Sequence, residues 1–260
     1  MTTMFDNRPA YAGWIVPVTA VLAWEIAARA HLLPDFLVAP TVILAQFYDM
    51  AMDGELWVHV GRSLVRSFGG FVIGAGLGII LGLLAGASSM AGSFLNPLVS
   101  VVYPVPKVAF LPILVVWLGL GDASQVAVIA VSVFFPTFIN TVAGARSVPL
   151  LLIWAARSVG ASRLRLFLFV TLPASLPHIL SGVRLGLGLS YVALFASELF
   201  GARSGLGYLI GVAEDSRRFD LMYVAIITIG LLGFLSDRAL LIARRRLLVG
   251  QTLTKEEYLA

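Results

Sequence analysis

The chain has 260 residues, of which 59% are hydrophobic and 12% are charged, and its mean hydropathy is +0.95. Soluble domains are roughly 45–50% apolar and about 25% charged, so this composition excludes a soluble protein. A formal net charge of +4 would suggest nucleic-acid binding in a soluble chain, but in a membrane protein it reflects basic loops, and we expect no nucleic-acid partner. The lack of cysteine excludes disulfides and thiolate chemistry.

Six apolar stretches are long enough to cross a bilayer, which takes about 20 helical residues. They are Ala12–Ala28, Phe68–Ala87, Leu98–Leu118, Val126–Ala143, Ile179–Phe200 and Leu221–Ile242. The first could be a signal peptide, but only Arg8 precedes its apolar core and Asp6 offsets that charge, so we interpret it as an uncleaved helix. The sequence therefore predicts an all-α polytopic membrane protein with about six transmembrane helices, and residues 1–260 form a single domain.

Basic residues predict how the chain is oriented, because cytoplasmic loops carry an excess of Lys and Arg. With the N-terminus inside, the inner segments hold nine such residues: Arg8, Arg146, Arg157, Arg163, Arg165, Arg244, Arg245, Arg246 and Lys255. The outer segments hold five: Arg62, Arg66, Arg203, Arg217 and Arg218. Both termini are therefore predicted to be cytoplasmic.

The second and third spans differ in kind. The second carries glycine at every fourth position, a stripe that lets another helix approach closely and so predicts a packing face: Gly70, Gly74, Gly78, Gly82 and Gly86. The third is interrupted by several prolines, with Lys107 among them. A broken helix in a membrane must lie against protein or line a cavity, so we expect this segment to be interior.

The longest inner loop, at about residues 144–178, predicts a helix-turn-helix. A first helix ends at Gly160, a second begins at a Ser162 cap, and we expect Pro173 to end it. A cytoplasmic segment this apolar must rest on something. From the pattern alone, lipid headgroups and a protein partner explain it equally well.

The same loop carries a family resemblance. Ala155-Ala156, three residues, Gly160, nine residues and Val170-Thr171-Leu172-Pro173 resemble the "EAA" loop of binding-protein-dependent ABC importer permeases. The segments 103–112 and 117–122, and Glu198 with Gly205-Leu206-Gly207, resemble the nitrate, sulfonate and taurine subfamily. The family's glutamate is Trp154 here, so any ion pair that the acid makes is absent. By this resemblance the ATPase-coupling residues are Trp154, Ala155, Ala156, Gly160, Ala161, Ser162, Leu172 and Pro173.

The resemblance implies the type I ABC importer (MetI-like) permease fold in a bacterial inner membrane. It also implies a second permease copy in a homodimer, two cytoplasmic ATPase subunits and an extracytoplasmic substrate-binding protein. The chain has no P-loop, since its only lysines are Lys107 and Lys255 and neither follows a glycine. We therefore expect no enzyme and no cofactor in this chain, with ATP and Mg bound by the partner ATPase.

The implied substrate is a small anion such as nitrate, an alkylsulfonate or taurine. A vitamin precursor of pyrimidine or flavin type stays open as an alternative for the same kind of importer. A stand-alone secondary transporter is the rival class, but it needs an ion-coupling site or inverted repeats, and neither is found in the sequence.

Lys107 and Glu198 are candidates for the substrate path, because ionisable groups in a span usually face a bundle interior or a water-filled path. Tyr191 and Phe195, which precede Glu198 in the fifth span, are candidates with it. Lys107 suits an anion, but it is equally explained by carbonyls that Pro104 and Pro106 free. For Glu198 the alternative is a hydrogen bond to amides of residues 205–207. We expect Glu25 to pair with Arg29. The three histidines are far apart in sequence and suggest no metal site.

Overall fold

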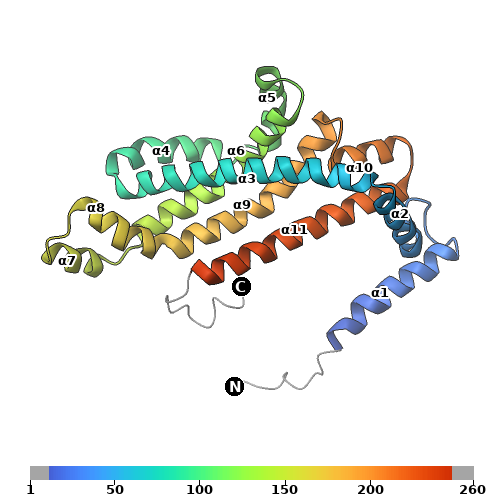
Figure 1. The fold of residues 1–260 in the computed structure, drawn as a ribbon, viewed down its shortest axis with the longest axis horizontal. Helices are drawn as coiled ribbons and strands as arrows, with labels where there is room; N and C mark the ends of the chain where they lie inside the picture. The colour runs from blue at the N-terminus through green and yellow to red at the C-terminus, as the bar shows by residue number, and fades with distance from the viewer. Residues whose placement is uncertain (1–11, 248–260) are drawn as a thin grey trace.

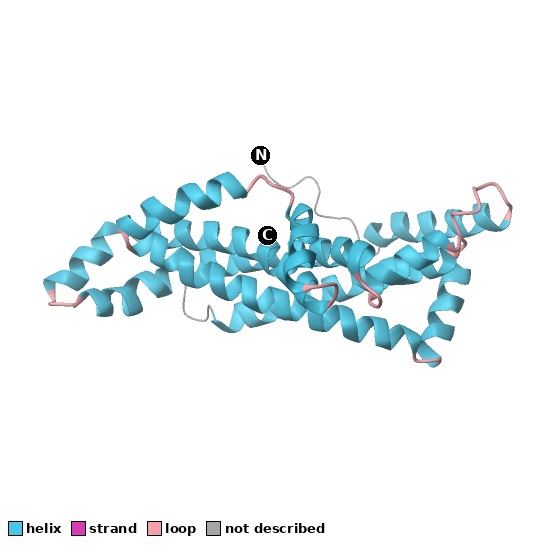
Figure 2. Cartoon of the chain, turned by 90° about the horizontal axis from the view of Figure 1, so that it is seen from above, coloured by secondary structure: helices cyan, strands magenta, loops and turns pink. Residues whose placement is uncertain are grey.

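The computed structural model describes residues 12–247, with side chains from residue 15 onward. Every regular element in this part of the chain is helical (Figure 2). The helices are α1 (Ala12–Arg29), α2 (Pro40–Met52), α3 (Glu55–Ala87), α4 (Ser89–Val102), η1 (Lys107–Phe110), α5 (Leu111–Leu118), α6 (Asp122–Arg146), α7 (Leu150–Ser158), α8 (Arg163–Leu166), η2 (Phe167–Thr171), α9 (Leu172–Gly201), α10 (Leu206–Asp215) and α11 (Phe219–Leu247). Arg8 and Lys255, which contributed to the predicted orientation, lie outside the described residues.

Four helical segments of the described chain are long and apolar enough to cross a membrane: α3, α6, the continuous run Arg163–Gly201 that contains α9, and α11. They contain the second, fourth, fifth and sixth predicted spans. The third corresponds to α4 together with residues 107–118, bent by 95° at the prolines, and counts as a fifth crossing if the pair is one span. The first predicted span is the helix α1, which is not among these segments, so six crossings remain a prediction.

The centre of the bundle is formed by α3, α6 and α9, which run side by side along its length (Figure 1). Ile129 and Val133 of α6 are fully buried in a cluster with Val183 and Leu194 of α9. All five glycines of the ladder in α3 face α6. A Cβ atom at Gly82 would lie 2.7 Å from the Cβ of Thr141, so only glycine lets these two helices approach this closely.

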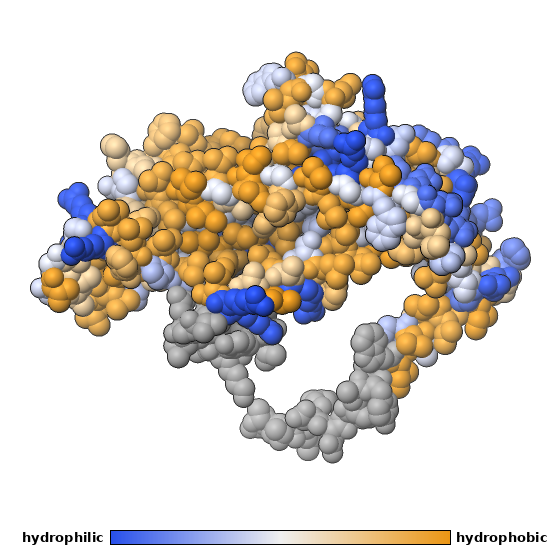
Figure 3. All heavy atoms as spheres, viewed as in Figure 1, coloured by the Kyte–Doolittle hydropathy of each residue, from blue (hydrophilic) through white to orange (hydrophobic). Residues whose placement is uncertain are grey.

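The apolar surface forms a band between two polar ends. Hydrophobic residues cover the middle of the bundle, and hydrophilic residues gather around α2 and α10 at one end and near α7 and α8 at the other (Figure 3). The turn between α3 and α4 lies at the same end as α7 and α8 (Figure 1). A lipid-facing belt with polar caps is the arrangement that a membrane imposes on a helical bundle.

The predicted helix end at Pro173 is wrong. The chain continues through the π-helical turn η2 directly into α9, and Pro173 lies in the first turn of α9. In η2 the Leu172 N–H donates to the Phe167 carbonyl, one residue further back than in an α-helix. Because Pro173 comes where the hydrogen-bond register changes, its missing N–H does not end the helix.

Candidate functional site

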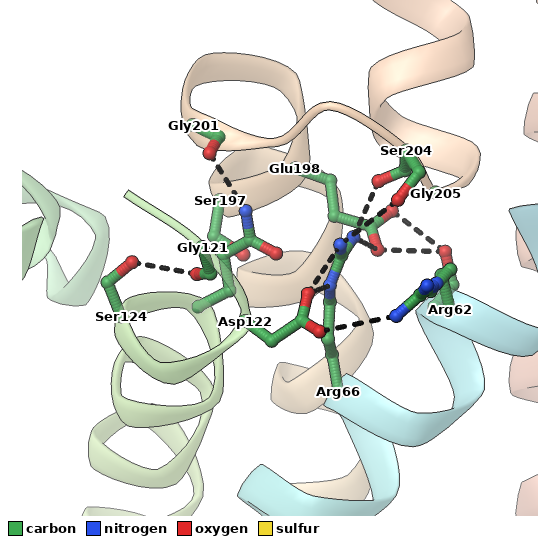
Figure 4. A network of polar contacts seen from close by, with 12 residues as sticks. Arg62, Arg66, Gly121, Asp122, Ser124, Ser197, Glu198, Gly201, Ser204 and Gly205 are labelled. Atoms are coloured by element: carbon green, nitrogen blue, oxygen red, sulfur yellow. Dashed lines mark hydrogen bonds and ion pairs between the residues drawn. The ribbon is translucent and has the colours of Figure 1, made fainter. Parts of the chain in front are cut away.

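A buried ion pair lies at the end of the bundle that carries α10 (Figure 4). Glu198 of α9 has no exposed surface and Arg66 of α3 is only 3% exposed. The Arg66 Nη1 atom lies 2.8 Å from Glu198 Oε1. The Ser63 hydroxyl oxygen lies 2.8 and 2.9 Å from the two carboxylate oxygens, and the Gly207 N–H donates to Oε2 at 2.9 Å. The alternative predicted for Glu198, a hydrogen bond to an amide of residues 205–207, is therefore present.

Arg66 also connects this pair to α6 and to the loop before α10. Its Nε and Nη2 atoms each lie 2.7 Å from Oδ1 of Asp122, and Nη1 donates to the Ser204 carbonyl at 2.6 Å. Arg62, one turn earlier in α3, lies 3.6 Å from Asp122 Oδ2 and is well exposed (Figure 4). A charge this deeply buried must be compensated by hydrogen bonds and an opposite charge. This cluster, Ser63, Arg66, Asp122, Glu198 and Ser204, thus clamps α3, α6, α9 and the α10 loop together.

The sequence reasoning missed this clamp, because Arg62 and Arg66 were counted as charges of an outer loop. The structure places both inside α3, which begins at Glu55, 13 residues before the predicted span. A signal was available: Arg66 stands four residues before Gly70, on the same every-fourth-residue stripe. That stripe faces another helix, so a cation on it needed a buried partner.

The four candidates for a substrate path are not brought together. Glu198 belongs to the clamp, and the Tyr191 hydroxyl lies 2.6 Å from Ser236 Oγ of α11. Lys107 lies at the bend between α4 and α5, where its Nζ atom donates to the carbonyls of Tyr103 (2.5 Å) and Val105 (2.6 Å). Phe195 is partly exposed on α9.

Two further ion pairs lie outside the clamp, one between two helices and one within a single helix. Arg184 of α9 and Asp237 of α11 bind each other, with Nε 2.8 Å from Oδ1 and Nη2 3.2 Å from Oδ2. Arg29 Nε lies 2.5 Å from Glu25 Oε1, as the four-residue spacing predicted. Glu25 also accepts the N–H of Thr41 at the start of α2, which connects α1 to α2.

The residues of the inner loop gather at the opposite end of the bundle from the clamp. α7 ends at Ser158, Gly160 two residues later has a left-handed φ of +79°, and the Ala161 N–H donates to the Ala156 carbonyl at 3.0 Å. Ser162 caps α8 by accepting the Arg165 N–H at 3.4 Å. The side chain of Trp154 is 61% exposed and that of Val159 is 83% exposed. α7 therefore presents an apolar surface beyond the bundle.

Known proteins that are similar to this chain are transport permeases. Residues 74–249 match the family "Binding-protein-dependent transport system inner membrane component". The chain is 35% identical to the taurine transport system permease protein TauC of Escherichia coli K12 over 229 residues, 86% of this chain and 83% of that protein. It is 33% identical to the putative aliphatic sulfonates transport permease protein SsuC of Bacillus subtilis 168 over 237 residues, 91% of this chain and 86% of that protein.

A solved structure of the MetNI methionine ABC transporter in an inward facing conformation has the same fold. The TM-score is 0.58 at 20% identity, and the match covers 75% of this chain and 98% of that chain. The resemblance found in the loop motif is thereby confirmed, as is the predicted multi-pass location in the inner membrane. This chain belongs to the inner membrane components of binding-protein-dependent transport systems, the permeases of ABC importers.

Proposed function

We propose that this chain is the permease of an ATP-driven importer for a small anion, most simply an organic sulfonate such as taurine, and that it works by alternating access in a homodimer. The names of the similar permeases, for taurine and for aliphatic sulfonates, support the substrate class. The family implies an ATPase and a substrate-binding protein as partners. In this proposal the ATPase is cytoplasmic and holds ATP and Mg, while the binding protein delivers the substrate from outside.

One observation carries the coupling to ATP: α7 and the turn after it expose Trp154 and Val159 outside the apolar band of the bundle. Exposed apolar surface of this kind marks a site of interaction with another molecule. We infer that this molecule is the ATPase subunit and that α7 seats in its surface. In this proposal the exposed Ala155 and the left-handed turn at Gly160 belong to the docking face.

Trp154 changes how this contact is made. The acid of the EAA pattern would offer a carboxylate, whereas an indole offers a large apolar face and one N–H donor. In this proposal the contact is therefore mainly apolar. The exposed Arg157, Arg163 and Arg165 around it supply the charged contacts.

The first experiment tests docking with the permease purified together with its ATPase. Ala156→Glu and Gly160→Glu are expected to remove the ATPase from the permease, while membrane insertion stays unchanged. Ser89→Glu is the matched control, because it adds the same charge to an exposed position at the same end of the bundle. Association is measured by co-purification and insertion by membrane fractionation. Loss of insertion in the loop variants would show that the loop is structural only.

The second experiment tests the energy source. Proteoliposomes that contain the permease, ATPase and binding protein are expected to take up taurine only when ATP is supplied to the ATPase side. The chain alone is expected to move no taurine under a proton or sodium gradient. If the chain alone does so, it is a secondary transporter and the importer proposal fails.

A further inference from the structure

A cavity of about 440 Å³ lies at the bend between α4 and α5, where the broken span meets α6 and α9. Its volume is within the range of about 300–1,000 Å³ that is common for small-molecule sites. Most of the wall is apolar, and Lys107 is its one charged residue. Around Lys107 the wall is formed by Tyr103, Ser132, Phe135, Leu189 and Val192, among others.

The cavity lies near the middle of the span. Ser132 and Pro136 follow Asp122, the first residue of α6, by 10 and 14 positions. At about 1.5 Å per helical residue, they stand about 15 and 21 Å along α6 from that end. The hydrocarbon core of a bilayer is about 30 Å thick. A lipid headgroup does not reach this depth, but a solute in transit does.

Lys107 brings a charge to this depth without a carboxylate beside it. Its Nζ atom is held by carbonyls of the broken helix and lies 4.6 Å from the centre of the Phe135 ring. Carbonyl dipoles and a ring face reduce the cost of the charge but do not cancel it. In the part of the chain that the structure describes, no acid lies within ion-pair distance of Lys107. By contrast, Arg66 pairs with Glu198 and Arg184 with Asp237.

The apolar part of the cavity wall determines which kind of anion fits beside Lys107. Leu189, Val192 and Phe135 offer apolar surface, which stabilises a ligand by removing its carbon atoms from water. An inorganic anion such as nitrate would satisfy the charge but would leave this surface unfilled. An anion that carries a short carbon chain satisfies both the charge and the apolar wall.

We infer that this cavity is a half-way binding site on the substrate path, which takes an organic anion by pairing its sulfonate or carboxylate headgroup with Lys107 and laying its carbon chain on the apolar wall. The inference rests on the proposed importer function and adds to it the site and the physical reason why that site favours an organic anion. It also assigns a role to the bend in the third span. The prolines there free carbonyls that hold Lys107 at the cavity wall.

ATP-driven uptake by the complete permease, ATPase and binding-protein complex tests this inference. The probes are ethanesulfonate, hexanesulfonate and nitrate, and a thermal shift of the binding protein shows which of them it delivers. Lys107→Met is expected to reduce sulfonate uptake about 10- to 100-fold, the loss typical of a hydrogen bond to a charged group, whereas Lys107→Arg keeps most of it. Basal ATPase activity and complex assembly are measured to show that Lys107→Met has folded.

A second pair of variants tests the apolar wall without touching Lys107. Val192→Trp fills part of the cavity and is expected to lower hexanesulfonate uptake more than ethanesulfonate uptake. Leu185→Trp is the matched control, because Leu185 is also exposed on α9, two turns away from Val192, and does not line the cavity.

The outcomes that would contradict the inference are the following. If Lys107→Met transports sulfonates at the wild-type rate, or if Val192→Trp acts like Leu185→Trp on both sulfonates, the cavity is not on the path. If the Val192→Trp result is the one that contradicts the inference, Lys107 has only a structural role and stabilises the bend between α4 and α5. If the wild-type complex takes up nitrate but neither sulfonate, the organic-anion substrate class is wrong, whereas the proposal of an ATP-driven importer is unaffected. If the wild-type complex takes up none of the probes with ATP, the proposed function fails as well.

Discussion

Arg66 and Lys107 are cations inside the same bundle, and their partners differ. Arg66 is buried against two carboxylates, whereas Lys107 is surrounded by carbonyls and aromatic rings. A buried ion pair adds little net stability when it forms, but it is costly to break, because one charge is then left without a partner. At this scale, the buried carboxylate partner of Arg66 indicates a structural role, whereas Lys107 has carbonyl partners and no counter-ion among the described residues.

Arg66→Met is expected to lower the free energy of unfolding by about 3–5 kcal/mol, because it leaves the carboxylate of Glu198 buried and unpaired. Unfolding in mixed detergent micelles measures the change. The double variant with Glu198→Gln is expected to recover part of the loss, since no buried charge remains. Arg62→Met is the matched control: its exposed pair with Asp122 is worth about 0–1 kcal/mol. An equal effect of Arg62→Met and Arg66→Met would contradict the clamp.

At the scale of elements, the contact between α3 and α6 and the turn η2 determine how the bundle is built. The glycine ladder brings two backbones together over about four and a half helical turns, so the gain in dispersion contacts is spread along the interface. The turn η2 instead joins the inner loop to α9 without a break. α8 is thus continuous with the helix that carries Glu198.

The ladder makes a prediction with an internal control. A Cβ atom at Gly82 would lie 2.7 Å from Thr141, whereas a Cβ atom at Gly76 of the same helix would meet nothing within 4 Å. Gly82→Ala is therefore expected to cost about 1–3 kcal/mol by overpacking, and Gly76→Ala to leave stability unchanged or slightly raised. Thermal unfolding of the two variants in detergent measures the difference. Equal stability would mean that α3 and α6 can separate without cost.

At the scale of the whole molecule, the two polar ends give the bundle a direction across the membrane. The end with α7 and α8 gathers the basic loop residues that favour the cytoplasm, and the opposite end carries α2, α10 and the clamp. The predicted orientation therefore places the coupling loop inside and the clamp outside. The proposed cavity lies between them.

Because the chain contains no cysteine, a single introduced cysteine reports this orientation cleanly. Asp53→Cys, exposed between α2 and α3, is expected to react with a membrane-impermeant maleimide in intact spheroplasts. Val159→Cys, exposed after α7, is expected to react only after the membrane is permeabilised. The degree of labelling, read by a gel shift, measures both. The reverse pattern would place the loop outside and contradict coupling to a cytoplasmic ATPase.

Hydrophobicity and short-range spacing were sufficient for the spans in α3, α6, α9 and α11, the glycine stripe and the Glu25–Arg29 pair, because each depends on residues that are close in the chain or on their composition. The motif from Ala155 to Pro173 was sufficient for the family. The end predicted at Pro173 was wrong because proline stops an α-helix but tolerates a change of register, which no local pattern reveals.

Contacts between distant residues needed the tertiary structure. Arg66 and Glu198 are 132 positions apart, and only the packing of α3 against α6 and α9 brings them together. Packing likewise separates Glu198 from Lys107, which seemed equal as candidates in the sequence, and forms a cavity beside Lys107. By itself the sequence determined a helical membrane permease of this family, since hydropathy and a local motif are properties of neighbouring residues, and the role of the loop in coupling stays a prediction. Which charges are paired depends on the fold, because a counter-ion is a neighbour in space.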